Sequence, residues 1–391
     1  MQKARGTPRR VLLTAGAALA VAGAATTAVV LASTPSVGLP IPTYLNAVSC
    51  ASPSSCVAVG SRLVHRQHPT DVVVLSSTTL TPIRSGMGHA FESVSCGSAN
   101  WCMTVGFGHT HRGIQSMAEA EIYSAGEWRS IPGPPGGDSR LSLSCVADDR
   151  CMAVTQIAGQ SLTTGGAAWW GGSSWREIAI AKSDLGGQFA GVSCARIAWC
   201  MVIGAHRVGR HQVLEPFSAI WDGKTLRSMP VPPTRSLEST LLSVSCNSAT
   251  ACLALGYSVV GNPNHPTVEG SVDQWDGRRW HVVRVPAAPG LTFLQSVSCP
   301  TSQACIVVGT NAPSGFIYGA NEMVAYEWAH NAWSELRIAS QPSWYPLYGG
   351  FLSIDCSSAR RCVAVGSADV MGRAWALVER WDGHAWTATL G

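Results

Sequence analysis

The sequence predicts an all-β protein assembled from repeated antiparallel units, and three features of its 391 residues support that prediction. Forty Gly and 22 Pro, with only 13% charged residues, favour many short strands and turns over helices. All 14 cysteines fall into a motif, Cys-x5-Cys, that recurs along the chain. A second motif follows each copy of the first, with two large apolar residues five positions apart. Because 46% of the residues are apolar, the chain can bury a core, which argues against disorder.

The N-terminus has the pattern of an export signal. Its first ten residues carry four basic side chains and no acidic one, and residues 11–32 form an uncharged run of mainly Ala, Gly, Val and Leu. Cleavage before Ser33 would give a secreted protein, but the run is also long enough to span a bilayer. Residues 1–32 are therefore expected to be a signal peptide or a membrane-anchor helix, followed by a Pro-rich linker at 33–43. Both alternatives place the rest of the chain outside the cytoplasm.

The net charge of +4 is accounted for by the four basic residues of this N-terminal segment, so the remainder is close to neutral. A neutral body gives no general support for a nucleic-acid-binding face, and we expect no nucleic-acid partner. The basic residues are nearly all Arg, a bias typical of a G+C-rich bacterial genome.

The first motif is clearest in the string Ser-Val-Ser-Cys-Pro-Thr-Ser-Gln-Ala-Cys-Ile-Val-Val-Gly at 296–309. It predicts two strands, A and B, with strand A ending at the first Cys and strand B starting at the second. In an exported chain such pairs are expected to form disulfides that act as local staples of the A–B hairpins, and the spacing is not one used for zinc. The expected pairs are Cys50/Cys56, Cys96/Cys102, Cys145/Cys151, Cys194/Cys200, Cys246/Cys252, Cys299/Cys305 and Cys356/Cys362.

The second motif is clearest in Trp275-Asp-Gly-Arg-Arg-Trp280. Two large apolar residues around an Asp-Gly turn predict a hairpin of strands C and D with a cross-strand aromatic pair. The fixed place of the aromatic residues in each repeat favours packing over ligand binding.

Each repeat therefore predicts four strands, and seven such units match a seven-bladed β-propeller, with a β-solenoid as the main alternative. The propeller is expected over residues 44–391. Its blades are expected at about 44–88, 89–136, 137–186, 187–236, 237–290, 291–346 and 347–391.

With both motifs in place, residues 44–391 resemble secreted actinobacterial β-propeller proteins of the kelch and galactose-oxidase type. The resemblance implies the fold and little about function, since propellers of this kind include hydrolases, oxidases, lyases and binding scaffolds. The Trp-Asp-Gly turn also resembles the Asp-box of sialidases. Asp276, however, precedes Trp280 by four positions, where an Asp-box has five.

In a propeller the A–B and C–D turns share one face, and the B–C and D–A connections share the other. Here the first set is uniform, whereas the second varies in length and is expected to carry any binding site. Histidines in the B–C loops could bind a metal, but these loops are poor in carboxylates, so we expect none. An Arg-rich, aromatic rim for an anionic ligand is expected from Arg62, Arg66, Arg112, Arg207, Arg210, Trp344 and Tyr345.

No Gly-x-Ser-x-Gly, His-Glu-x-x-His or phosphate-binding loop is present in the sequence. We therefore expect a non-catalytic, monomeric propeller without a cofactor that binds a cell-envelope glycan or a protein partner on its B–C/D–A face. The alternative is a glycan-active hydrolase or lyase. It would need two carboxylates about 5–9 Å apart. The candidates are Glu215, Glu238, Glu269 and Glu322.

Overall fold

The computed structural model describes residues 44–61, 70–75, 80–84, 90–109, 116–136, 139–158, 163–180, 187–234, 236–262, 264–285, 291–312, 322–339, 348–370 and 373–390. The expected signal or anchor at 1–32 and the linker at 33–43 lie outside these residues. Across the described ranges there is no helix with the length and apolar character needed to cross a membrane.

Within the described residues, 28 strands form seven antiparallel sheets of four consecutive strands, and each sheet is one blade. The prediction of an all-β propeller with four-stranded antiparallel blades is confirmed. Blade 1 contains β1 (Tyr44–Ser52), β2 (Ser55–Ser61), β3 (Thr70–Leu75) and β4 (Leu80–Arg84); blade 2 contains β5 (Ala90–Ser98), β6 (Trp101–His109), β7 (Ser116–Ser124) and β8 (Glu127–Pro132); blade 3 contains β9 (Arg140–Ala147), β10 (Arg150–Ala158), β11 (Thr163–Trp170) and β12 (Trp175–Glu177); blade 4 contains β13 (Gly187–Arg196), β14 (Trp199–Val208), β15 (Val213–Trp221) and β16 (Leu226–Met229). Blade 5 contains β17 (Glu238–Ser248), β18 (Ala251–Asn262), β19 (His265–Trp275) and β20 (Trp280–Val283); blade 6 contains β21 (Leu291–Ser298), β22 (Ala304–Ala312), β23 (Glu322–Ala329) and β24 (Ala332–Glu335); blade 7 contains β25 (Tyr348–Ser358), β26 (Arg361–Val370), β27 (Arg373–Trp381) and β28 (Trp386–Leu390).

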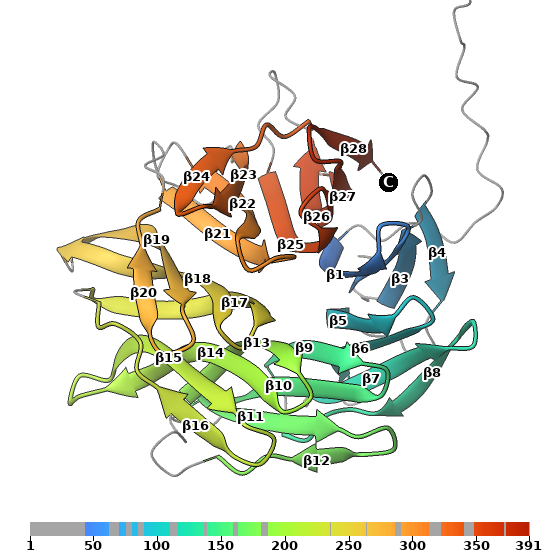
Figure 1. Cartoon of the computed structure of the whole chain (residues 1–391), viewed down its shortest axis with the longest axis horizontal. Coiled ribbons are helices and arrows are strands. Elements are labelled where there is room, and N and C mark those ends of the chain that lie inside the picture. Colours follow the sequence, from blue (N-terminus) through green and yellow to red (C-terminus); the bar gives the residue numbers. More distant parts are fainter. Residues whose placement is uncertain are drawn as a thin grey trace, which may run out of the picture. The chain divides into compact units, whose positions relative to one another are not determined.

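The first strand of each blade contacts the first strand of the next, and β25 contacts β1, so the blades form a closed ring (Figure 1). The apolar core lies between blades. Each cluster of buried side chains combines two consecutive sheets, as where Met152 and Trp169 of blade 3 pack with Phe189 and Val202 of blade 4. Because the faces of neighbouring sheets cover one another, each blade depends on its two neighbours for burial.

Register pairs confirm the predicted hairpins. Cys246 lies opposite Cys252 at the A–B turn, and Trp275 lies opposite Trp280 at the C–D turn, with ring centroids 5.5 Å apart. Strand A does not end at the first Cys as predicted. In blade 5 it continues to Ser248, because pairing resumes beyond the disulfide between Ser248 and Ala251.

The expected disulfides are present in all seven blades, and the described residues include no free cysteine. The bonded pairs are Cys50–Cys56, Cys96–Cys102, Cys145–Cys151, Cys194–Cys200, Cys246–Cys252, Cys299–Cys305 and Cys356–Cys362.

The bridges join the two strands of each A–B hairpin as expected, and Cys102, Cys151 and Cys200 in addition belong to the core between blades. Their exposed fractions are 2%, 0% and 0%, and each belongs to an apolar cluster between two blades. The second Cys lies on strand B, whose alternate side chains point into the space between neighbouring sheets, so its sulfur is covered by the adjacent blade. These three cysteines are therefore part of the core as well as of the turn, and none can touch a ligand.

The Asp-Gly turn owes its uniformity to the Asp side chain. In blade 5 the Oδ1 of Asp276 accepts hydrogen bonds from the backbone N–H groups of Arg278 and Arg279, at 2.8 and 2.9 Å. Gly277 has φ +93°, in the left-handed region that favours glycine. The side-chain hydrogen bond from His281 and the two backbone hydrogen bonds hold the pKa of Asp276 well below its usual range. This carboxylate therefore stays ionised as a turn cap.

The Gly that ends the first motif is required for a different structural reason. In six blades the first strand carries a bulge opposite this Gly, as between Leu241 and Ser243 opposite Gly256. A Cβ on Gly256 would collide with the carbonyl oxygen of Thr240. Blade 3 has Thr155 in place of the Gly, and its first strand has no bulge there. The Gly thus permits the close backbone approach that the bulge creates.

The serines of Ser-x-Ser-Cys link the blades. The residue directly before the first Cys accepts a hydrogen bond from the backbone N–H of the first Cys in the next blade. Ser95 Oγ, for example, accepts from Cys145 N at 2.9 Å, and Ser144 Oγ accepts from Cys194 N at 2.9 Å. The earlier Ser makes the same contact two residues upstream, as from Leu143 N to Ser93 Oγ at 3.1 Å. The repeated serines therefore satisfy backbone donors on the exposed edge of each first strand.

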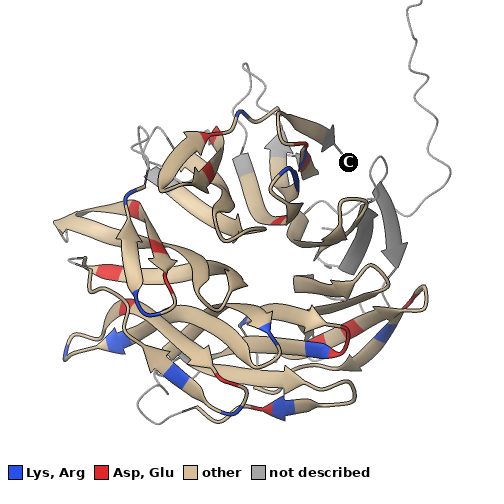
Figure 2. Ribbon diagram, in the orientation of Figure 1, with Lys and Arg blue, Asp and Glu red and all other residues tan. Residues whose placement is uncertain are grey.

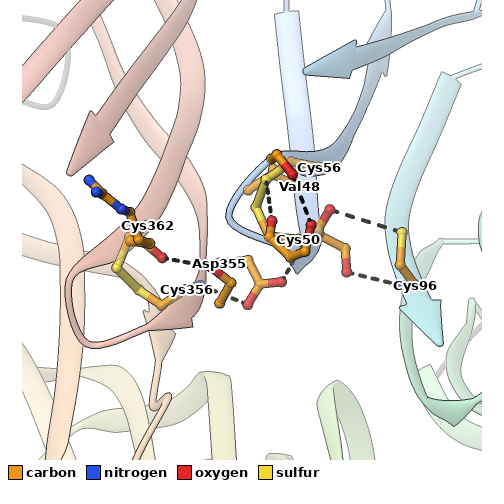
Figure 3. The surroundings of a disulfide bond; sticks show 12 residues. Val48, Cys50, Cys56, Cys96, Asp355, Cys356 and Cys362 are labelled. Carbon is orange, nitrogen blue, oxygen red and sulfur yellow. Dashed lines mark hydrogen bonds between the residues drawn. A yellow bond between two sulfur atoms is a disulfide. The ribbon is translucent and has the colours of Figure 1, made fainter. Parts of the chain in front are cut away.

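The last blade closes the ring with the same device, and among the described strands none is shared between blades 7 and 1. Ser353 Oγ accepts from Val48 N at 3.2 Å. The position before the first Cys, however, is Asp355 rather than Ser. Its Oδ2 accepts from Cys50 N at 2.7 Å and its Oδ1 accepts from Cys356 N at 2.9 Å (Figure 3). Within the described residues, the ends of the ring are thus joined by side chains and packing and not by a β-ladder.

The B–C connections of blades 4 and 5, which were expected to be variable loops, are partly strand. The segment expected as a B–C loop at 205–212 is strand up to Val208, and the one at 257–267 is strand up to Asn262 and again from His265. In both segments the antiparallel pairing continues residue by residue to the tip of the hairpin, with Val208 opposite Val213 and Asn262 opposite His265. These two B–C connections are therefore long hairpins that extend the B–C/D–A face.

Candidate binding groove on blade 4

The B–C/D–A end of blade 4 contains a groove of about 360 Å³. We call it the blade-4 groove. Its walls come from the end of β14, the start of β15 and the segment that leaves β16. The lining residues are His206, Arg207, Glu215, Pro216, Phe217, Ser228, Met229, Pro230, Val231, Pro232 and Pro233.

A tight turn at the tip of the β14–β15 hairpin holds one wall of the groove. Gly209 and Gln212 have φ of +70° and +53°, and the side-chain amide of Gln212 donates to the carbonyl oxygen of Gly209 at 3.0 Å. Arg207 Nη1 donates to the carbonyl oxygen of Gln212 at 3.0 Å. This bond fixes part of the guanidinium while Arg207 remains exposed to solvent, so its other donors can face a ligand.

His206 lies at the floor of this wall, opposite Glu215 on β15 and opposite Gly187 on β13. The His206 ring meets the edge of Phe217 with centroids 5.8 Å apart. Its Nδ1 is buried and has no hydrogen-bond partner among the described residues. A buried ring nitrogen without a partner is a hydrogen-bonding site that a ligand could use.

The opposite wall is rich in proline. Pro230, Pro232 and Pro233 follow β16, and Pro216 faces them from β15. Proline lacks a backbone donor and keeps the chain extended, so this wall offers apolar surface and carbonyl oxygens. Met229 anchors its start, since its carbonyl oxygen accepts a hydrogen bond from Ser218 Oγ at 3.1 Å.

Of the predicted ligand-binding residues, Arg207 lines the groove, whereas Arg210 lies at the exposed hairpin tip and does not. The structure therefore brings Arg207 together with His206 and Glu215, and not with Arg210. The remaining predicted residues lie outside the described residues: Arg62, Arg66, Arg112, Trp344 and Tyr345.

The sequence interpretation missed His206 and Glu215 as partners in one site and did not assign a role to the proline wall. The proline run was visible in the D–A segment. The pairing of His206 with Glu215 was not, because it depends on the strand register continuing through a predicted loop.

The carboxylates considered for glycan cleavage do not converge in blade 5. Glu238 lies opposite Val259 and Glu269 lies opposite Ser258 on the same strand, β18. Consecutive residues of a strand point to opposite faces, so these two carboxylates lie on opposite faces of the sheet. Within the described ranges, no group of three or more His, Cys, Asp or Glu side chains is arranged to hold a metal ion. Charged residues in the described part are scattered over an uncharged ribbon (Figure 2).

Two further hollows lie at the opposite end of the blades. One, of about 300 Å³, is between blades 5 and 6. The other, of about 470 Å³, is between blades 7 and 1. Both are lined by A–B and C–D turns, on the face that we expected to be uniform. The variable face is therefore not the only one with a hollow.

The disulfides differ in whether they reach these hollows. Cysteines of blades 5 and 6 line the first hollow, and cysteines of blades 7 and 1 line the second. Cys102, Cys151 and Cys200 line none of these three hollows.

Comparison with known proteins shows the fold alone. No protein-family model matches the chain, and no curated protein matches it either. Among solved structures it is similar to the β-propeller domain of the Trilobed protease from Pyrococcus furiosus, which has an open Velcro topology. The TM-score is 0.56 at 10% identity, over 88% of this chain and 94% of that chain.

A second similar structure is YCF48 bound to D1 peptide, with a TM-score of 0.52 and 13% identity over 89% of this chain and 99% of that chain. A third is the acylaminoacyl peptidase of Pyrococcus horikoshii, with a TM-score of 0.53 and 10% identity over 88% of this chain and 52% of that one. These likenesses show the β-propeller fold, and in this chain each blade carries a disulfide.

Proposed function

We propose that this propeller is a non-catalytic binding protein that acts outside the cytoplasm and holds an extended segment of a protein partner in the blade-4 groove. A disulfide in each blade is consistent with an oxidising compartment. The basic and apolar N-terminal residues, and the resemblance of the repeats to secreted kelch-type propellers, support the same location. Propellers of this fold include both peptidase domains and a peptide-bound protein, so the fold alone does not decide the function.

The observation that carries the proposal is the combination of a proline wall with a buried, unpaired His206 Nδ1. A glycan site would present the flat face of an exposed aromatic ring. The one aromatic ring at this groove, besides the imidazole, is Phe217, which is only 5% exposed. An extended peptide instead packs its side chains against proline and uses its backbone for hydrogen bonds. The groove therefore favours a peptide over a sugar.

Charge would fix the direction of the bound segment. Arg207 and Glu215 both line the groove and carry opposite charges. A segment with an acidic side chain near Arg207 and a basic one near Glu215 would be accepted in one orientation and repelled in the other. The groove is thus suited to an extended segment with apolar or proline residues between two charges of opposite sign.

The test uses the oxidised full chain and an array of extended peptides that combine proline with charged ends, followed by anisotropy on the best binders. Arg207→Gln should weaken binding about tenfold or more, since it removes charge-assisted hydrogen bonds. Arg227→Gln is the matched control, because Arg227 pairs with Asp222 at the other end of the same blade and is 74% exposed. Peptide binding that is indifferent to Arg207→Gln, or binding of neutral glycans that Arg207→Gln abolishes, would contradict the proposal.

A further inference from the structure

The hollow between blades 7 and 1, which we call the seam pocket, lies beside the junction that closes the ring. It has a volume of about 470 Å³, within the range of small-ligand sites. Blade 1 contributes its A–B turn, and blade 7 contributes both its A–B and its C–D turn. The lining residues are Cys50, Pro53, Ser54, Cys56, Ser357, Arg361, Cys362, Val363, Arg380, Trp381, Asp382 and Thr387.

Two positions that carry buried apolar side chains in blade 2 are arginines at the seam. The residue before the second Cys is Trp101 in blade 2 and Trp199 in blade 4, and both are buried against the next blade. In blade 7 it is Arg361, which is exposed. The residue before the first aromatic of the C–D hairpin is Ile122 in blade 2, only 1% exposed. In blade 7 it is Arg380, so charged groups take the place of apolar packing.

Arg380 is held against blade 1 by its strand. It alternates with Ala376 and Val378, whose side chains pack against Leu45 and Ala58 of blade 1. Its Nη2 is buried and has no hydrogen-bond partner among the described residues. Desolvation lowers the pKa of Arg380, but a guanidinium stays protonated at any physiological pH. The pocket thus contains a cation that has lost water on one side without gaining a partner.

A carboxylate at the rim has a free oxygen. Asp382 Oδ1 accepts from the backbone N–H groups of His384 and Ala385, both at 2.8 Å. In blade 5 the matching Oδ2 is paired with His281 at 2.7 Å, and in blade 4 it is paired with Arg227 at 3.4 Å. Blade 7 has Thr387 at that position, and no bond to Asp382 Oδ2 is made within the described residues. Asp382 Oδ2 is therefore open to a hydroxyl donor at the pocket's edge.

We propose that the seam pocket binds the acidic ring of a hexuronate sugar. The buried guanidinium of Arg380, with Arg361 beside the entrance, receives the carboxylate, for which a planar guanidinium is the matched partner. The sugar hydroxyls meet the hydroxyl groups of Ser54, Ser357 and Thr387 and the free oxygen of Asp382. A peptide carboxylate would use the arginines equally well, but it would leave these hydroxyl partners unused. A ligand here contacts both ends of the ring and holds blade 7 against blade 1.

The test is titration calorimetry of the oxidised full chain with D-glucuronate, and with D-glucose as the neutral match. Glucuronate should bind and glucose should bind at least about tenfold more weakly, because only glucuronate supplies the charge. Arg380→Gln should weaken glucuronate binding by about 10- to 100-fold. Arg150→Gln is the control, since Arg150 precedes the second Cys of blade 3 and donates to the carbonyl oxygen of Asp149; it should leave binding unchanged.

A second readout separates binding from folding. Glucuronate should raise the midpoint of thermal unfolding of the native protein, and should not do so for Arg380→Ile, which restores the apolar residue of blade 2 and is expected to fold. Equal binding of glucose and glucuronate, or unchanged affinity in Arg380→Gln, would overturn the proposal. So would a peptide with a free C-terminal carboxylate that binds through Arg380 where glucuronate does not. None of these outcomes depends on Arg207, so this site and the blade-4 groove stand or fall separately.

Discussion

The Oδ2 atom of Asp355 accepts a hydrogen bond from the backbone N–H of Cys50 at 2.7 Å, across 305 residues of sequence. The same carboxylate accepts from Cys356 N and from Ser298 Oγ, so it connects blades 6, 7 and 1. Burial raises the pKa of the Asp355 carboxyl, and its hydrogen bonds oppose that rise. This carboxylate therefore joins the last blade of the described ring to the first.

Replacing Asp355 tests this closure. Asp355→Ala should lower the free energy of unfolding by about 1–3 kcal/mol, because Cys50 N–H loses its acceptor. Asp355→Ser should keep most of the stability, since Ser is the acceptor at the same position of blades 2, 3, 4, 5 and 6. Urea denaturation of the three proteins measures both. Equal destabilisation by Ala and Ser would show that the hydroxyl cannot replace the carboxylate at this junction.

The junction between blades 1 and 2 lacks one of the repeated hydrogen bonds, because Ala47 stands where five of the other blades have the first Ser and blade 4 has Gly191. In blade 2 that Ser accepts from Leu143 N at 3.1 Å. Ala47→Ser should therefore add a hydrogen bond from Val94 N and stabilise the protein by about 0.5–1.5 kcal/mol. Thermal unfolding measures the gain. Ala47→Val, which has no hydroxyl, is the control, and a gain in that variant would attribute the effect to packing.

Asp273 gives the fold a pH dependence. It is buried on β19, and desolvation raises its pKa to about 6 from 3.8. Between about pH 4 and 6 the folded state binds more protons than the unfolded state, so this group's contribution to stability falls as pH rises through that window. By pH 7 the loss is about 2 kcal/mol relative to pH 4.

Asp273→Asn removes this titration. Urea denaturation should show the variant more stable than the native protein at pH 7, by an amount that shrinks toward pH 4. A difference between the two proteins that stays constant from pH 4 to 7 would mean that Asp273 titrates normally in the folded state.

The bulge opposite the motif Gly predicts unequal tolerance of a methyl group. Gly256→Ala should cost about 1–3 kcal/mol or more, because its Cβ meets the carbonyl oxygen of Thr240 and a backbone atom cannot move aside. Thr155→Ala in blade 3, at the matching position without a bulge, should change stability by less than about 1 kcal/mol. Denaturation midpoints of the two variants give the comparison. If Thr155→Ala loses as much stability as Gly256→Ala, the bulge is not the reason for the loss at Gly256.

Each disulfide closes a short loop, since the paired cysteines are six positions apart. Loop-closure entropy for such a loop is about 2 kcal/mol, so changing both Cys246 and Cys252 to Ser should destabilise blade 5 by about that amount. The remaining six disulfides should keep the protein folded. Unfolding of the double variant in urea, at neutral pH without reductant, measures the cost. A loss of folding instead would mean that this bridge is needed for the fold to form.

The repeats, the four strands per blade, the aromatic cross-strand pairs and the disulfides could be predicted from sequence, because each depends on residues close together in the chain. The burial of Cys151 could not, because the side chains that cover it include Trp101 of the preceding blade. The hydrogen bond from Cys145 N to Ser95 Oγ was missed as well. It joins strands of neighbouring blades that are 50 residues apart in sequence, and only the packing of the blades in the ring places the two residues side by side. The hairpin through Arg207 was taken for a solvated loop because of its Arg and His residues, but antiparallel pairing continues through them.

The candidate sites divide in the same way. Arg207 was predicted, because its hairpin lies on the variable face. Arg380 was not predicted, because its role depends on the cover that blade 1 provides. It also depends on Arg361 and Arg380 standing where blade 2 has the buried Trp101 and Ile122, and only the three-dimensional structure shows that these two positions line the same space.

A ring whose junctions use similar side-chain contacts has no privileged starting point. Because blades 7 and 1 are joined by Asp355 and Ser353 much as blades 2 and 3 are joined by Ser95 and Ser93, the chain could begin elsewhere. A circular permutant that links Leu390 to Tyr44 through a connection like the one between β16 and β17, and that opens before β13, should fold into the same propeller. Asp355 would then lie at a junction that a covalent link also holds together, and its hydrogen bonds would contribute less to closing the ring.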